Sequence, residues 1–329
     1  MLTIDTTLPI SHRPIIRWQL DSGVHALFGP SGAGKTTLLR ILAGLEPSAG
    51  TTRYRSQVWQ SPQRSRPMPV WQRDLAWLDQ HPELVPSKSL AQQIAWIAGS
   101  RNTEYWHKAA EKFGLTHLWD HRPRGWSGGE VDRAALLCTV AAPKRLMILD
   151  EPLNRVDRPL RLEILSWLAE HARQRQRDAI FTSHDFRDVE RFADSVSYLA
   201  EDGLVGPMDP SKFFLRPPSL AAARLLGYEG TLNDGDTLLA VHPRRVAVGS
   251  SPGLGPVLSG SIVGRHLEEG QWAISFVADG SEQPWTACLP VDAVGDGCDR
   301  ITLTLISPPR FTRSGEAAEG HFSHPQSHR

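Results

Sequence analysis

The sequence predicts an α/β domain built on a mostly parallel sheet, followed by a small β domain. In the first two thirds of the chain, short apolar runs alternate with amphipathic stretches, as strands and helices do in such domains. One predicted strand–helix junction carries a glycine-rich loop that ends in Lys-Thr-Thr. After Pro217 and Pro218, glycine becomes frequent and apolar residues alternate with polar ones, which is typical of half-buried strands.

The elements of the first domain follow from the spacing of apolar residues. Short apolar runs predict strands at Val24 to Phe28, Leu146 to Leu149, Ala179 to Thr182 and Val196 to Leu199. Lys35 to Ala43 is expected to form a helix that ends at Gly44. From Leu160, apolar residues recur every three or four positions, which predicts another helix. We interpret residues 84–130 as a helical insertion, because Pro86 to Trp126 is rich in helical patterns.

We assign residues 1–218 to the first domain and residues 219–313 to the second. In the second domain, apolar residues alternate between Trp272 and Phe276 and between Ile301 and Leu305, which predicts a small barrel. The remaining tail, 314–329, has no apolar pattern and is predicted to be disordered. Its histidines are potential metal ligands, although a solvated tail is the simpler interpretation: His321, His324 and His328.

Composition excludes several classes of protein. The 329 residues include 36 basic and 36 acidic side chains, so no net charge attracts nucleic acid or an anionic membrane. The three cysteines, Cys138, Cys288 and Cys298, have no metal-ligand spacing and are expected to be free thiols in a reducing compartment. The sequence shows neither a signal peptide nor a membrane-spanning run, which predicts a soluble cytosolic protein.

The strongest chemical signal is a phosphate-binding loop between the first predicted strand and helix. It comprises Gly29, Pro30, Ser31, Gly32, Ala33, Gly34, Lys35, Thr36 and Thr37. Glycines allow the backbone N–H groups to curl around a phosphate, and the start of the helix adds its positive dipole end. Lys35 is expected to contact the β- and γ-phosphates of a nucleotide, and the Thr36 hydroxyl to bind Mg²⁺. A glycine-rich turn that matches by accident is the alternative.

A second signal is the pair of acids that follows the buried run Leu146 to Leu149. Asp150 and Glu151 are placed at the carboxyl edge of the sheet, where open α/β folds bind ligands. Asp150 is suited to hold Mg²⁺ through water, and Glu151 to orient or deprotonate an attacking water. Alone, two acids would more often be a solvated strand end; the phosphate-binding loop upstream favours the functional interpretation.

Between these two signals lies Trp126-Ser127-Gly128-Gly129-Glu130, followed by a helix predicted from Val131 to Ala142. Ser127 and Glu130 have the spacing of a capping box, which would make this segment an ordinary helix start. Paired glycines at a helix start also leave N–H groups free for a phosphate, and both interpretations can hold together.

In this order and at these intervals, the phosphate-binding loop, Ser-Gly-Gly-Glu and Asp-Glu resemble ATP-binding-cassette ATPases, over about residues 23–203. The resemblance implies that Ser127, Gly128, Gly129 and Glu130 form the signature that acts on the nucleotide of a second subunit. It also implies that two copies sandwich two ATP molecules with Mg²⁺. The β domain is similar to the transport-associated appendage of importer subunits.

The resemblance implies three further site residues. Gln80, at the junction with the helical insertion, would contact Mg²⁺ and sense a membrane partner. Asp157 would act across the interface of the two copies, although it could merely cap the following helix. His184 would contact the γ-phosphate, although it could be an ordinary loop histidine.

Several positions depart from the family pattern. Trp126 replaces a leucine, Asn154 to Asp157 replaces Ser-Ala-Leu-Asp, and Val131-Asp132-Arg133 stands where a glutamine–arginine pair is usual. No aromatic residue precedes Trp18, so no ring for stacking on adenine is evident. These departures bear on the adenine contact, the dimer interface and the turnover rate.

The resemblance finally implies partners and a location. The chain would work as a homodimer at the cytoplasmic face of the cell (inner) membrane, against an integral permease that receives solute from a periplasmic or extracellular binding protein. Molybdate or tungstate importers match best, and such an oxyanion could also bind the appendage beyond about Leu238. Importers of sulfate, iron, thiamine, polyamine or sugar remain alternatives, as do a soluble non-transport ATPase of this type and a sensor that binds ATP without hydrolysis.

Overall fold

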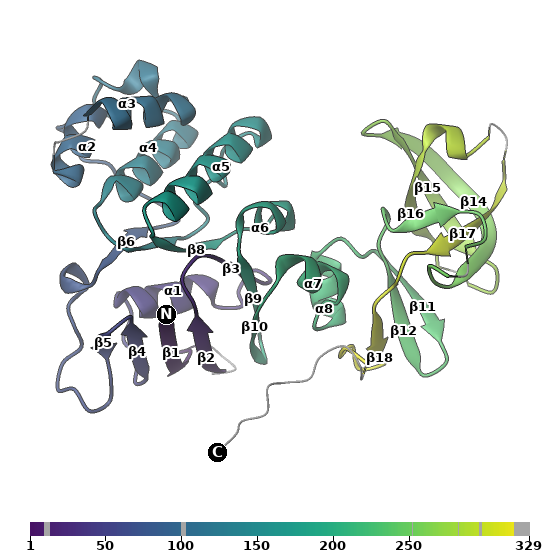
Figure 1. Cartoon of the computed structure of the whole chain (residues 1–329). Coiled ribbons are helices and arrows are strands. Elements are labelled where there is room, and N and C mark those ends of the chain that lie inside the picture. Colours follow the sequence, from purple (N-terminus) through teal and green to yellow (C-terminus); the bar gives the residue numbers. More distant parts are fainter. Residues whose placement is uncertain (10–13, 100–102, 252, 282, 296–297, 319–329) are drawn as a thin grey trace. The chain divides into compact units, whose positions relative to one another are not determined.

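The computed structural model describes residues 1–9, 14–99, 103–251, 253–281, 283–295 and 298–318. The chain divides into two compact units, Met1–Pro210 and Ser211–Arg329, which are described separately (Figure 1). The first is an α/β unit and the second is mainly β-structure, so the predicted fold class is confirmed.

The central sheet of the first unit has six strands in the order β10-β9-β3-β8-β7-β6. Their bounds are Gly203–Met208, Ser195–Ala200, Val24–Phe28, Asp178–Thr182, Leu146–Leu149 and Leu75–Leu78. Only β10 is antiparallel to its neighbour. Strands β3, β7 and β8 are buried along their whole length, which explains their continuous apolar runs. Because the five parallel strands end at one edge, the residues that follow four of them, after Phe28, Leu78, Leu149 and Thr182, gather there.

A second, antiparallel sheet runs in the order β2-β1-β4-β5. Its strands span Ile15–Leu20, Leu2–Thr7, Thr51–Tyr54 and Gln57–Gln60. Helix α1 (Lys35–Ala43) lies between the two sheets (Figure 1), and its apolar side chains join both in one core cluster. As predicted, α1 ends at Gly44, which has a φ of 84°. Trp18 lies in this core and donates its indole N–H to Ser197.

The helical insertion is confirmed. Helices α2 (Leu90–Ala98) and α3 (Thr103–Lys112) and the 3₁₀ turn Thr116–Leu118 precede α4, and the three helices gather beyond the β6 end of the sheet (Figure 1). Helix α4 spans Gly128–Ala141, so it begins before the predicted Val131 because the capping box at Ser127 starts it. The remaining elements of this unit are the 3₁₀ turn Val70–Gln72, α5 (Arg158–Gln174) and α6 (Phe186–Phe192).

The second unit begins with two short helices, α7 (Pro210–Leu215) and α8 (Leu220–Leu225), of which α7 starts at the last residue of the first unit. One sheet holds β11 (Gly230–Asp234), β12 (Thr237–Val241) and β18 (Arg310–Thr312). The other has the order β13-β17-β14-β15-β16, with bounds Val246–Val248, Arg300–Leu305, Val257–Glu268, Gln271–Ala278 and Trp285–Pro290, and the 3₁₀ turn Val291–Ala293 follows β16. Ile274, Phe276, Leu303 and Leu305 are buried in one cluster, as the alternation predicts.

The predicted tail is only partly within the described residues. Its first part is ordered rather than disordered: Glu316 forms a bridge with Ser219 and accepts a hydrogen bond from the Thr312 N–H. Backbone pairing, which needs no apolar pattern, explains why the sequence missed this. Residues 319–329, with the three tail histidines, lie outside the described residues.

The cysteines are free thiols, as expected. Cys138 is buried in α4, and burial raises its pKa to about 12, whereas Cys288 and Cys298 are half-buried in the second unit. Within the described ranges, no helix is long and apolar enough to cross a membrane.

Candidate functional site

The loop after β3 is shaped by its glycines. Gly29 has a φ of 152°, and a side-chain Cβ there would lie 2.1 Å from the carbonyl oxygen of Leu199 on the neighbouring strand. Gly34 is the N-cap of α1 in the left-handed conformation. Between them, Ser31 and Gly32 are exposed at the tip. The loop therefore turns tightly and presents backbone to solvent at the start of a helix, as phosphate binding requires.

The side chain of Lys35 folds back toward the start of this loop and contacts its backbone. Its Nζ donates hydrogen bonds of 2.9 Å to the carbonyl oxygens of Gly29 and Pro30, and the residue is only 6% exposed. Burial lowers the pKa of Lys35, and the negative charges of Glu151 and Asp150 oppose that change. The ammonium is thus held by two backbone carbonyls. A bound phosphate can take the place of these carbonyls as its hydrogen-bond partner.

Asp150 follows β7 and is 1% exposed. Its Oδ1 accepts a hydrogen bond of 2.8 Å from the Thr182 hydroxyl at the end of β8. Burial raises the pKa of Asp150, and the hydroxyls of Thr36 and Thr182 oppose that rise. Among the residues that the structure describes, its buried Oδ2 has no hydrogen-bond partner. A buried carboxylate oxygen beside a threonine hydroxyl is a fitting donor set for Mg²⁺, which prefers oxygen ligands.

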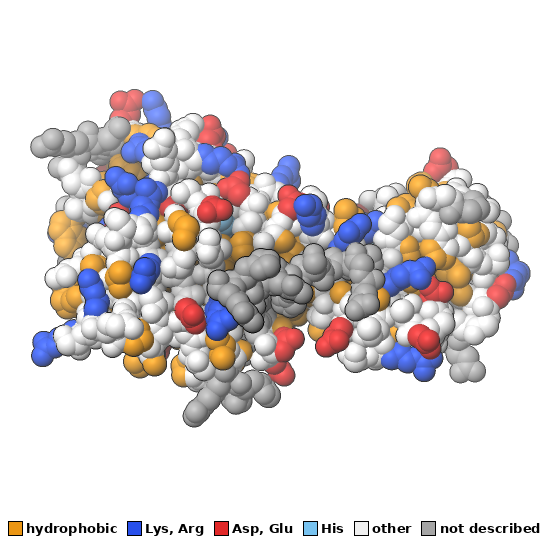
Figure 2. Space-filling model, turned by 60° about the horizontal axis from the view of Figure 1, so that its bottom comes forward, with side chains coloured by type: hydrophobic (Ala, Val, Ile, Leu, Met, Phe, Trp, Pro, Cys, Tyr) orange, Lys and Arg blue, Asp and Glu red, His pale blue; other side chains and the backbone are white. Residues whose placement is uncertain are grey.

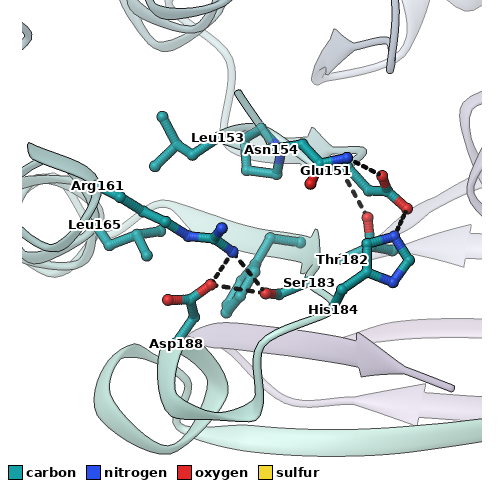
Figure 3. A pocket seen from close by; sticks show the side chains of 11 residues that line it. Glu151, Leu153, Asn154, Arg161, Leu165, Thr182, Ser183, His184 and Asp188 are labelled. Atoms are coloured by element: carbon teal, nitrogen blue, oxygen red, sulfur yellow. Dashed lines mark hydrogen bonds and ion pairs between the residues drawn. The ribbon is translucent and has the colours of Figure 1, made fainter. Parts of the chain in front are cut away.

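Glu151 is the centre of a polar cluster (Figure 3). It has a φ of 47°, unusual for a residue other than glycine, and its N–H donates to Thr182 Oγ1 at 2.7 Å. Its Oε2 accepts from Gln80 at 3.1 Å and from Asn154 at 3.0 Å, and its Oε1 lies 2.5 Å from His184 Nε2. The carboxylate is therefore fixed from three sides at the carboxyl edge of the sheet.

The turn that carries His184 is held by contacts among Ser183, Arg161 and Asp188 (Figure 3). Ser183 donates to Asp188 at 2.7 Å, and Arg161 of α5 donates to Ser183 at 3.0 Å and forms an ion pair with Asp188. Asp188 is 2% exposed, so this ion pair is shielded from water. These contacts join α5 and α6 to the turn and fix where the imidazole can reach.

The capping box predicted at the start of α4 is present. Ser127 Oγ accepts from the Glu130 N–H at 3.3 Å, and Glu130 Oε2 accepts from the Ser127 N–H at 2.8 Å. His117 lies 3.0 Å from the other carboxylate oxygen. Hydrogen bonds from Ser127, and then from His117, lower the pKa of Glu130 to about 2. Glu130 thus stabilises the helix start, while Gly128 and Gly129 occupy its first turn.

The structure brings some predicted residues together and leaves others apart. Gln80, Glu151 and His184 touch, and Lys35 and Asp150 lie close enough to influence one another. Asp157 is the N-cap of α5, where its side chain accepts from the Leu160 N–H, so the capping interpretation holds. The contacts of Asp157 across an interface stay a prediction.

Sequence reasoning missed three contributors. Thr182 links both acids, and Asn154 holds Glu151. Arg155 pairs with Asp132 at the start of α4, a contact between two positions that depart from the family pattern. A polar residue at the end of the buried run before His184 was the available signal for Thr182.

Comparison with known proteins agrees with this geometry. Residues 16–154 match the family model described as ABC transporter. The chain is 35% identical over 194 residues to a molybdenum import ATP-binding protein of Albidiferax ferrireducens, which covers 57% of this chain and 52% of the relative. It is 32% identical over 225 residues to one of Rhodopseudomonas palustris, covering 65% and 58%. A molybdate/tungstate import ATP-binding protein of Thermococcus kodakarensis is 29% identical over 226 residues, covering 66% and 67%. The chain thus spans about half the length of the first of these relatives.

Proposed function

We propose that this chain is the ATP-hydrolysing subunit of an importer for molybdate or tungstate, because residues 16–154 match the family model described as ABC transporter. The observation that carries the proposal is the contact of Glu151 with Gln80 and His184 beside the buried Asp150. The named relatives, which import molybdenum or molybdate and tungstate, support the choice of solute.

ATP binding falls to the loop after β3. The N–H groups around Ser31 to Gly34 and the ammonium of Lys35 hold the phosphates, and Lys35 exchanges its carbonyl partners for them. Thr36, Asp150 and Gln80 would hold Mg²⁺, which would supply positive charge next to the β- and γ-phosphates. Thr37 lies next to this loop at the start of α1 and completes the nucleotide contacts.

Glu151 acts on water. Its carboxylate orients the attacking water in line with the γ-phosphate and accepts its proton, while His184 contacts the γ-phosphate from the next strand end. A second copy of the chain closes over the nucleotide with Ser127, Gly128 and Gly129, and Asp157 contacts that copy. Phosphate at this helix start is favoured by its free N–H groups and dipole.

The same contacts give a route to a membrane partner. Gln80 follows β6 and leads into the helical insertion, so a shift at Glu151 is passed to α2 and α3 and to a permease seated beside them. We place the subunit at the cytoplasmic face of the membrane for this reason. The second unit is the appendage, and a binding site for molybdate or tungstate within it is part of the proposal.

The alternative of a nucleic-acid-binding ATPase has less support. Basic and acidic side chains are interspersed on the face shown in Figure 2, rather than gathered into a basic stripe. The equal numbers of basic and acidic residues in the sequence agree with this. A sensor that binds ATP without hydrolysis is the remaining alternative, and the test of Glu151 addresses it.

The hydrolysis test compares the wild-type chain with Glu151→Gln. We expect ATP binding to persist and turnover to fall by about 10³-fold or more, because the base is lost while the phosphate loop is unchanged. The matched control is Glu163→Gln, on the exposed face of α5 where it pairs with Lys112. Unchanged hydrolysis in Glu151→Gln would remove Glu151 as the base, and ATP binding without hydrolysis in the wild-type chain would favour the sensor.

The solute test is titration calorimetry of the whole chain with molybdate, tungstate and sulfate. Saturable molybdate or tungstate binding that is lost when the second unit is removed supports a regulatory site there. Hydrolysis without oxyanion binding leaves the ATPase proposal in place and removes the site in the appendage. Co-purification with a multi-span membrane protein tests the partner.

A further inference from the structure

Arg155 and Asp132 form a two-pronged ion pair between the turn after β7 and the start of α4. Arg155 Nε lies 2.7 Å from Oδ2 of Asp132, and Nη2 lies 2.6 Å from Oδ1. The Asp132 residue is 7% exposed, whereas the side chain of Arg155 is 53% exposed. A carboxylate this buried needs its partner, since removing the cation would leave a charge without compensation.

The same arginine lies against the paired glycines. A Cβ on Gly128 would come within 2.6 Å of Arg155 Nη1, and one on Gly129 within 2.9 Å of the Arg155 carbonyl oxygen. At Gly129 the nearby atom belongs to the backbone, so only a residue without a side chain lets the turn approach α4 this closely; at Gly128 it is the movable end of the Arg155 side chain. The ion pair and the glycines therefore act together to hold the turn on the first turn of the helix.

The turn also reaches Glu151. Asn154, the residue before Arg155, donates to Glu151 Oε2 at 3.0 Å. Two adjacent residues thus contact the proposed base and the proposed signature of the same chain. In a pair of copies that share two ATP molecules, those two groups serve different nucleotides.

We propose that Arg155 is a positioning residue that, through Asp132, locks the start of α4 to the turn carrying Glu151, so that signature and base move as one body. The inference rests on the proposed function. Because the side chain of Arg155 is half exposed, water screens the ion pair, and the effect that we test is its effect on geometry. The two positions that depart from the family pattern, Arg155 and Asp132, therefore belong to one interaction.

The first test needs no catalysis. Hydrogen exchange is measured on the whole chain for the wild type, Arg155→Ala, Asp132→Ala and the double variant. We expect exchange to rise about tenfold both at the amides of α4's first turns and in the turn 151–157 in each single variant. The double variant should exchange no faster than the singles, because one shared interaction is removed. The matched control is Arg173→Ala, which removes an ion pair with Asp194 from a similarly exposed arginine.

The second test is steady-state ATP hydrolysis by the same variants. We expect kcat to fall about tenfold with the KM for ATP changed less than about twofold, since the phosphate loop is intact. Arg155→Lys should recover only part of the loss, because an ammonium cannot make the two-pronged contact. Exchange confined to Arg155's own turn, or equal to that of Arg173→Ala, would overturn the proposal. A wild-type chain that does not hydrolyse ATP would count against the proposed function alone, and the exchange result would still decide the role of Arg155.

Discussion

The hydroxyl of Thr182 donates a hydrogen bond of 2.8 Å to the buried Oδ1 of Asp150. Thr182 Oγ1 also accepts a hydrogen bond of 2.7 Å from the main-chain N–H of the next acid, Glu151. One side chain at the end of β8 therefore sets the positions of two carboxylates at the end of β7. Thr182 is 1% exposed, so water does not compete for these bonds.

Replacing Thr182 by Val tests this arrangement. Valine keeps the shape of threonine but leaves the Glu151 N–H and the Asp150 Oδ1 without their partner. We expect a loss of about 1–3 kcal/mol in the free energy of unfolding, together with slower ATP hydrolysis. Thr182→Ser, which retains the hydroxyl, should lie close to wild type. Denaturant titration and a hydrolysis assay measure the two effects. A Thr182→Val variant as stable as Thr182→Ser would show that the hydrogen bonds of Thr182 contribute little to stability.

The backbone of the phosphate loop gives a second prediction. In Gly29→Ala the new methyl group would meet the Leu199 carbonyl oxygen at 2.1 Å, at a φ that alanine avoids. We expect ATP binding to be lost and the thermal midpoint to fall by several degrees. Gly32→Ala is the control for conformation alone, because its φ is 81° but no atom lies within 4 Å of the new Cβ. Equal losses of stability in both variants would mean that the clash is relieved by movement of β9.

A pH dependence follows from His171. The residue is buried between α3 and α5, stacked on Trp167 and within 2.6 Å of the Tyr105 hydroxyl. Burial, followed by the charges of Arg177 and Arg175, lowers its pKa to about 3. Between this value and the unfolded value of about 6.5 the unfolded chain binds the extra proton, so stability falls as the pH drops through that window.

In His171→Gln this contribution disappears. The thermal midpoint of the first unit should then fall less steeply between pH 6.5 and pH 4 than in the wild type, as measured by calorimetry. The control is His107→Gln, because His107 is only half-buried and packs edge-on against Trp119. Parallel curves for wild type and His171→Gln would show that His171 is not responsible for acid sensitivity.

The sequence predicted the parts of the fold that have strong local signals. Strand β3 and helix α1 were placed with their observed bounds, because one is fully buried and the other ends at a glycine. The antiparallel sheet was missed: β4 and β5 are four residues each, and Thr51–Tyr54 has no apolar run. Such strands depend on pairing with their neighbours, β4 with β1 and β5 with β4, which is a property of the folded chain.

The residues of the candidate site also divide into those with a local sequence signal and those without one. The loop from Gly29 and the acids were predicted because each belongs to a pattern that carries its own chemistry, whereas Gln80 followed only from the family resemblance. Thr182 has no pattern, since its importance depends on two neighbours on another strand. Arg155 and Asp132 were noticed only as separate departures, because they are 23 positions apart in the sequence and meet only in the folded chain.

The buried Cys138 gives the chain a native reporter of opening. Its thiol lies inside α4 with a pKa of about 12, so at neutral pH almost no thiolate is available to attack an alkylating reagent while the helix stays packed. Cys288 and Cys298 belong to the second unit and are partly exposed. Labelling followed by mass spectrometry therefore distinguishes a folded chain, which is tagged only in its second unit, from a chain whose first unit has unfolded.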